Sequence, residues 1–252
     1  MTLDILPETA YLFMLIFARL GTMIMVLPAL GERSVPARIR LGFALALTVV
    51  LHPVLAPAFA DLPQGLYALL RPLIVEVATG LFVGLSVRLV MSALYVAGTA
   101  IAMQTGLGFA QNVDPTQGVQ AALFASFLSV LAVTMILVTD LHHMLIAAIV
   151  DSYELFRPGA LVPVGDFAEM AVRTVAGSFK VAVQMSAPFL VFGLIFYLGL
   201  GVLSRLMPQV QIFFVAMPVN ILVGFILFMM LLGVMINWFL RHFEAVVAQF
   251  LA

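Results

Sequence analysis

Six long apolar stretches, separated by short polar links, dominate the sequence. They cover residues 9–30, 41–60, 72–103, 119–150, 181–204 and 212–240. Each is at least about as long as the roughly 20 apolar residues that an α-helix needs to cross a bilayer. None shows the sustained alternation of apolar and polar residues that a membrane β-barrel requires. The pattern therefore predicts an all-α protein with about six hydrophobic, membrane-associated helical segments, in a single unit that covers residues 1–252.

Prolines within or beside these stretches argue against a plain six-helix bundle, because proline ends or bends a helix. They are Pro28, Pro53, Pro57, Pro188 and Pro218, of which Pro218 is expected to break the last stretch. The link at 151–180 is the most soluble-looking part of the chain. It predicts a loop followed by an amphipathic helix from about Asp166, before the fifth apolar stretch begins.

A polar, glycine-rich interruption, QTGLGFAQNVDPTQG at 104–118, stands between two of the longest apolar stretches. Backbone groups without helical partners are tolerated at membrane depth only against protein or a water-filled cavity. Glycine also takes backbone conformations that other residues avoid. We therefore expect this loop to line or plug a passage, with these candidate residues: Gln104, Gly106, Leu107, Gly108, Phe109, Asn112, Asp114, Pro115 and Gly118.

Composition narrows the class of protein further. Hydrophobic residues make up 64% of the chain and charged residues 9%, whereas soluble domains carry about 25% charged residues. Lipid or other apolar subunits must therefore cover much of the surface. The net charge of −1 argues against a nucleic-acid partner. The absence of cysteine excludes disulfides and thiolate metal sites.

Four charged residues lie inside apolar stretches: Arg19, Glu76, Arg88 and Asp140. An intramembrane charge is costly, so it indicates either function or pairing. The functional interpretation is a proton or ion relay, and the structural one is salt bridges between helices or subunits, for instance Arg19 with Glu76. Because the four positions are scattered, we favour the structural interpretation. Basic residues are spread almost evenly over the links, so the positive-inside rule does not decide the orientation.

Catalysis and metal binding find little support in the sequence. His142 and His143 follow Asp140 closely, but neighbouring residues point about 100° apart on a helix and do not readily serve one metal. There is no GxSxG motif and no facing pair of aspartates, so we expect no enzyme and no cofactor. Met103, Met207 and Met217 flank polar breaks and are candidates for a soft gasket around a pore, although core packing is the simpler role for methionine.

Several short motifs, taken in order, resemble the FliR/SctT family of type III export-gate proteins. No single motif is specific, but together they extend over most of the chain, and Gln104–Leu107 and His142 are closer to the flagellar branch than to the injectisome branch. The matching residues are Arg19 with Pro28, ERSVPARIRLG at 32–42, Glu76 with Gly80 and Gly84, QTGLGFA at 104–110 with Asp114-Pro115, His142 with 151–152 and 158–159, Pro188, and residues 203–224.

This resemblance implies a subunit of an export gate in the bacterial inner membrane, at the flagellar basal body. Its partners would be FliP and FliQ homologues, FlhB and FlhA homologues, membrane lipid and the unfolded flagellar proteins that pass through. The assembly would wind helical hairpins around a channel, which a loop at 106–118 helps to close. Four charged residues of the first link would contact other subunits or lipid: Glu32, Arg33, Arg38 and Arg40.

Three alternatives stay open at this point: a small-molecule transporter, an injectisome gate subunit of the SctT type, and a passive structural membrane subunit. A transporter of the common kind would carry an inverted repeat with a polar site at the midplane. We find no convincing internal repeat in the chain.

Overall fold

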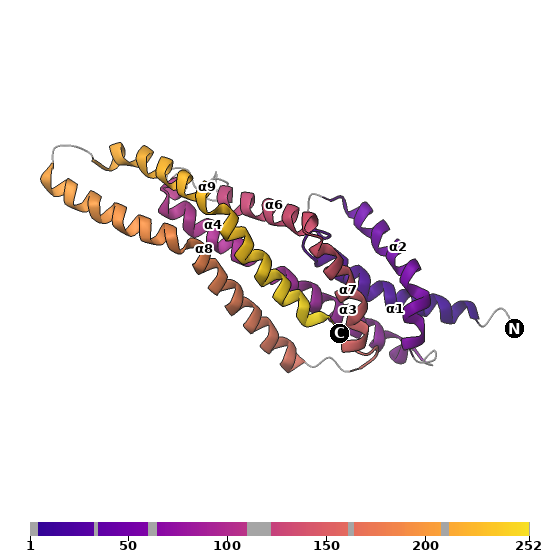
Figure 1. Cartoon of the computed structure of the whole chain (residues 1–252). Helices are drawn as coiled ribbons and strands as arrows, with labels where there is room; N and C mark the ends of the chain where they lie inside the picture. The colour runs from indigo at the N-terminus through magenta and orange to yellow at the C-terminus, as the bar shows by residue number, and fades with distance from the viewer. Residues whose placement is uncertain are drawn as a thin grey trace. The chain divides into compact units, whose positions relative to one another are not determined.

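The computed structural model describes residues 5–32, 35–59, 65–109, 122–160, 164–207 and 212–251. Within these ranges the chain is helical and contains no strand, which confirms the predicted all-α class. The α-helices are α1 (Ile5–Val26), α2 (Ala37–Leu55), α3 (Leu66–Val90), α4 (Ser92–Gln104), α6 (Ala122–Val138), α7 (Leu141–Leu155), α8 (Val164–Leu206) and α9 (Ile212–Val247) (Figure 1). Three short 3-10 helices accompany them in the described ranges: η1 (Ala56–Ala58), η2 (Leu107–Phe109) and η4 (Ala248–Phe250).

The helices pack into two compact units, each built from separate parts of the chain. The first unit comprises Met1–Val90, Ile136–Thr174 and Phe243–Ala252, and the second comprises Met91–Met135 and Val175–His242. Helices α8 and α9 contribute residues to both units. That residues 1–252 form a single domain stays a prediction.

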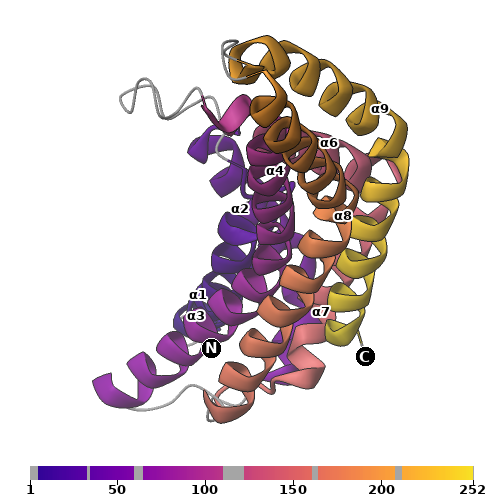
Figure 2. The same ribbon diagram turned by 90° about the vertical axis from the view of Figure 1, so that its left-hand side faces the viewer.

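In the first unit, α1 and α3 lie side by side and run in the same direction (Figure 2). Near their N-terminal ends, the hydroxyl of Tyr11 donates to the carbonyl of Leu69 at 2.9 Å. Near their C-terminal ends, Arg88 donates to the carbonyl of Val26 at 3.0 Å. Because α1 and α3 run in the same direction, the chain must run back between them, and α2 makes this return.

Two glycines make the close contact between α1 and α3. A methyl group at Gly80 would collide with the Thr22 hydroxyl and the Arg19 carbonyl, and one at Gly84 would come within 3.2 Å of Val26. Small residues let helix backbones approach closely in membranes. The spacing of Gly80 and Gly84 in the sequence is that of a GxxxG pair, which predicts a close helix contact, and their contacts with α1 confirm this prediction.

In the second unit, α8 and α9 form an antiparallel pair, drawn in orange and yellow in Figure 1. The rings of Phe189 and Phe228 lie 6.4 Å apart between centroids. Further along the same pair, Ser178 and His242 lie within hydrogen-bond distance at 3.2 Å. Helix α4 packs on α6 at Gly98, where an added methyl group would lie 2.9 Å from the Ala125 Cβ and closer still to the Ala125 backbone.

Three predicted segment boundaries are wrong. The stretch at 119–150 is divided into α6 and α7 at Asp140, which has a left-handed backbone conformation with φ of 59°. The amphipathic helix and the fifth apolar stretch form one continuous helix, α8, of 43 residues. Helix α9 continues through Pro218, so the break expected there does not occur. Pro218 lies beyond the first turn and removes one backbone hydrogen bond, and a proline inside a helix can bend it without ending it.

Five helical segments in the described ranges are long and apolar enough to cross a membrane, or six if α6 and α7 count together as one span. This agrees with the number of hydrophobic segments predicted. Large apolar side chains also lie on the surface, for example Val50 at 67% exposure and Met230 at 75%. Lipid or other apolar subunits must cover such side chains.

Candidate functional site

The first unit contains a fully buried ion pair between α1 and α3. Arg19 Nε lies 2.5 Å from Glu76 Oε2, and Arg19 Nη2 lies 3.1 Å from Glu76 Oε1. Both side chains are 0% exposed. The pairing suggested from the sequence is therefore confirmed, and its two parallel N–H···O bonds have the fork geometry that arginine favours with carboxylates.

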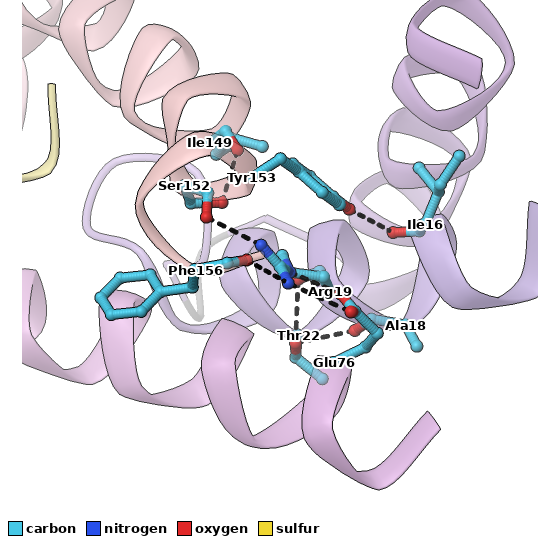
Figure 3. Close-up of polar contacts among 9 residues, drawn as sticks. All are labelled: Ile16, Ala18, Arg19, Thr22, Glu76, Ile149, Ser152, Tyr153 and Phe156. Atoms are coloured by element: carbon cyan, nitrogen blue, oxygen red, sulfur yellow. Dashed lines mark hydrogen bonds and ion pairs between the residues drawn. The ribbon is translucent and has the colours of Figure 1, made fainter. Parts of the chain in front are cut away.

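The other donors of Arg19 reach the C-terminal end of α7. Nη1 donates to the carbonyl of Ser152 at 2.8 Å, and Nη2 donates to the carbonyl of Phe156 at 3.0 Å. The guanidinium also lies 4.1 Å from the centre of the Tyr153 ring. Figure 3 shows how these groups surround it. The carbonyls at the C-terminal end of a helix carry a partial negative charge and favour a nearby cation, so Arg19 holds α7 against α1 and α3.

This arrangement supports the structural interpretation of the intramembrane charges. Arg19 directs its guanidinium at four acceptor contacts, and neither member of the pair faces solvent. Arg88 is half-buried and donates to the carbonyl of Val26, the last residue of α1. Three of the four charges therefore connect helices of the first unit.

The fourth charge, Asp140, lies at the surface in the break between α6 and α7, together with His142 and His143. The side chains of Asp140 and His143 are 76% and 69% exposed. One ligand atom from each of the three residues lies within 4.8 Å of the others, and the two imidazole rings are 4.1 Å apart between centroids.

The geometric argument that neighbouring histidines diverge on a helix is thus wrong here, because both lie in the first turn of α7, where their rings converge. One carboxylate and two imidazoles can bind a transition metal such as zinc. Within the described ranges no residue beyond these three joins the group. That the chain needs no metal stays a prediction.

In the second unit, the C-terminal end of α4 is enclosed by α8 and α9. Asn220 of α9 donates from Nδ2 to the carbonyl of Gln104 at 3.2 Å. A methyl group at Gly224 of α9 would lie 2.7 Å from Thr105 Cβ, and one at Gly193 of α8 would lie 2.9 Å from Gln104 Cδ. Small residues therefore let both helices close on the point where the predicted gate loop starts.

The first part of that loop is described by the structure. Gln104 ends α4, Gly106 has a left-handed φ of 79°, and Leu107, Gly108 and Phe109 form η2. The remaining candidates, Asn112, Asp114, Pro115 and Gly118, lie outside the described residues.

An apolar cavity of about 440 Å³ opens beside Leu107 in the second unit. Its other walls are formed by α6 and α9, where the rings of Phe124 and Phe228 lie 4.7 Å apart between centroids. Of the predicted gasket methionines, Met103 and Met207 are exposed and Met217 is half-buried. A gasket role for them stays a prediction.

The charged cluster of the first link is only partly inward-facing. Arg40 is half-buried and donates to the carbonyl of Gly31 at 3.3 Å, Glu32 is half-buried, and Arg38 is exposed. Arg33 lies outside the described residues. Contacts of this cluster with other subunits or lipid therefore stay a prediction.

Sequence reasoning missed two groups of functional candidates. The carbonyls of Ser152 and Phe156 could not be found, because backbone acceptors carry no signal in residue type. Asn220 does leave a signal, since it is a polar residue two positions after Pro218 in the apolar first half of α9.

Taken together, the long apolar helices, the buried ion pair and the exposed apolar surface define a helical membrane protein built to pack against other chains or lipid. The chain belongs to the family described as "Bacterial export proteins, family 1", which its sequence matches over residues 10–246. This confirms the resemblance drawn from the sequence motifs.

Curated relatives agree with this assignment. The chain is 44% identical over 235 residues to the flagellar biosynthetic protein FliR of Caulobacter vibrioides, covering 93% of this chain and 94% of the relative. It is 31% identical over 236 residues to that of Bacillus subtilis (92% and 88% covered), and 32% identical over 208 residues to that of Escherichia coli (82% and 78% covered). The chain is therefore a membrane protein of flagellar export.

Proposed function

We propose that the chain is a core subunit of the protein-conducting export gate in the bacterial inner membrane, at the base of the flagellum. It assembles there with FliP and FliQ homologues, beside FlhB and FlhA homologues, and unfolded flagellar proteins pass through the shared channel. Membership of a bacterial export family and the flagellar name of its relatives support this proposal. So does the exposed apolar surface, which requires other subunits or lipid to cover it.

The observation that carries the gate role is the start of the loop at 104–118. An apolar helix, α4, ends there at Gln104, and the chain turns at Gly106 with a positive φ. The end of α4 is buried between helices, so the polar segment begins in the interior of the second unit. A polar segment that starts inside an apolar protein needs a cavity or protein partners, and we assign it to the closed channel.

Deletion of residues 110–118 in the assembled complex tests this role. We expect the deleted complex to leak small ions across the membrane, measured as dissipation of an ion gradient in proteoliposomes. The matched control removes the exposed Glu169–Arg173 ion pair by Glu169→Gln and Arg173→Met. Unchanged permeability in a complex that assembles with its full set of subunits would rule out the gate loop.

A further inference from the structure

A buried asparagine of α9 holds the end of α4 in the second unit. Asn220 is 2% exposed, and its Nδ2 donates to the carbonyl of Gln104 at 3.2 Å. Gln104 is the last residue of α4, so its carbonyl has no partner within the helix. An unpartnered carbonyl away from water is costly, and Asn220 supplies the donor it needs.

The backbone beyond Gln104 fits closely around this hydrogen bond. Gly106 follows with φ of 79°, and a methyl group there would lie 3.2 Å from Asn220 Nδ2. Gly224 lies one turn after Asn220 on the same face of α9, and it leaves room for the side chain of Thr105. We call Asn220 and Gly224 the α4 seat.

The other polar atom of the Asn220 side chain, Oδ1, is buried and has no hydrogen-bond partner in the described part of the chain. An apolar side chain would avoid burying that oxygen. The hydrogen bond to Gln104 is therefore the interaction through which a polar residue contributes here.

We infer that Asn220 is a positioning residue: by donating to the Gln104 carbonyl, it fixes the direction in which the chain leaves α4 and so orients Leu107 and the root of the gate loop. The inference rests on the proposed function only for the consequence that a loosened root weakens channel closure. The orientation of the root itself can be measured separately.

A cysteine placed at Leu107 gives the direct measurement, because the natural chain contains no cysteine. In the complex assembled with FliP and FliQ homologues, its rate of modification by a small water-soluble maleimide reports how well the root is held. We expect Asn220→Leu to raise this rate about tenfold, as the loss of one hydrogen bond of ordinary strength allows. Asn237→Leu is the matched control, since Asn237 is exposed on the same helix.

A second pair of variants separates the hydrogen bond from packing. Gln and Met have nearly the same shape, but only Gln can donate a hydrogen bond. We expect the cysteine placed at Leu107 to be modified more slowly in the Asn220→Gln variant than in the Asn220→Met variant. If Asn220→Leu does not assemble, this pair, measured in the same way, decides the question.

Two outcomes would overturn the inference: labelling of Asn220→Leu at the rate of Asn237→Leu, or equal labelling of Asn220→Gln and Asn220→Met. Ion leak through the same complexes is measured in parallel. If Asn220→Leu labels faster without ion leak, and the complex lacking residues 110–118 does not leak either, the gate role of the loop is refuted. The positioning role of Asn220 would still stand.

Discussion

At the scale of single residues, Arg19 shows how a charge can be retained inside an apolar protein. Its guanidinium contacts one carboxylate and two helix-end carbonyls, so desolvation of the charge is offset by directed hydrogen bonds. A lysine could not reproduce this pattern, because an ammonium group lacks the planar fork. Glu76 is the only one of these acceptors that carries a negative charge. Loss of Glu76 therefore leaves a buried cation, whereas loss of Arg19 affects a buried carboxylate and two carbonyls.

Removing either partner should destabilise the first unit, by different amounts. Glu76→Gln leaves Arg19 without a counter-charge and should cost about 3–5 kcal/mol. Arg19→Met should cost more, because it leaves a buried carboxylate without its counter-charge and also removes the hydrogen bonds from Arg19 to the carbonyls of Ser152 and Phe156. The unfolding midpoint of the purified chain in detergent measures both effects.

The exposed ion pair of Glu169 and Arg173 provides the comparison for this prediction. Its side chains are 63% and 77% exposed, so its removal should change the stability by less than about 1 kcal/mol. Equal stability of Glu76→Gln and this control would show that the buried pair contributes little.

At the scale of helices, glycines set the distances between neighbours. Gly80 and Gly84 bring α3 onto α1, whereas Gly98 brings α4 onto α6. Other glycines, such as Gly233 on α9, have open space around them. The same residue type therefore marks a helix contact in one place and a free surface of the single chain in another.

Gly98→Ala should force α4 and α6 apart, because the added methyl group would meet the backbone of Ala125. We expect the substitution to cost about 1–3 kcal/mol, the usual range for overpacking. Gly233→Ala is the control and should stabilise α9 by up to about 1 kcal/mol. Denaturant unfolding in detergent compares the two variants, and a neutral Gly98→Ala would contradict the close contact.

Sequence reasoning succeeded where the energetic cost of a buried charge, or the small size of a residue, is enough to identify a contact. It found the pairing of Arg19 with Glu76, because an isolated charge is expensive in an apolar helix, and it found Gly80 and Gly84 from their spacing. It failed where tertiary packing decides. Helix α8 continues through a charged, soluble-looking beginning, and Asn220 meets a carbonyl 116 residues away in the sequence.

At the scale of the whole molecule, the surface is incomplete without neighbours. Helix α2 buries only Ala44, Thr48 and Leu55, and most of its large apolar side chains are exposed. A chain with such a surface is stable only in lipid, in detergent or in an assembly. The charged link that precedes α2 lies beside this apolar surface in the sequence, which makes it a candidate for subunit contacts.

Charge reversal at Arg38 tests these contacts, since Arg38 is exposed and a new glutamate there need not disturb the fold. We expect Arg38→Glu to reduce co-purification with FliP and FliQ homologues several-fold, while the unfolding midpoint of the isolated chain stays the same. Arg157→Glu, at another exposed position of the first unit, is the control. Intact co-purification of Arg38→Glu would remove Arg38 from the interface.

The pairing of Arg19 on α1 with Glu76 on α3 has a consequence for biosynthesis. Arg19 leaves the ribosome 57 residues before Glu76 and 133 residues before Ser152. At translation rates of about 5–20 residues per second, its carboxylate partner follows about 3–11 seconds later. Throughout that interval Arg19 lacks its Glu76 partner, and an arginine at the centre of a span costs about 2.5–3.5 kcal/mol. We therefore expect α1 to become more stable in the bilayer once α3 has been made.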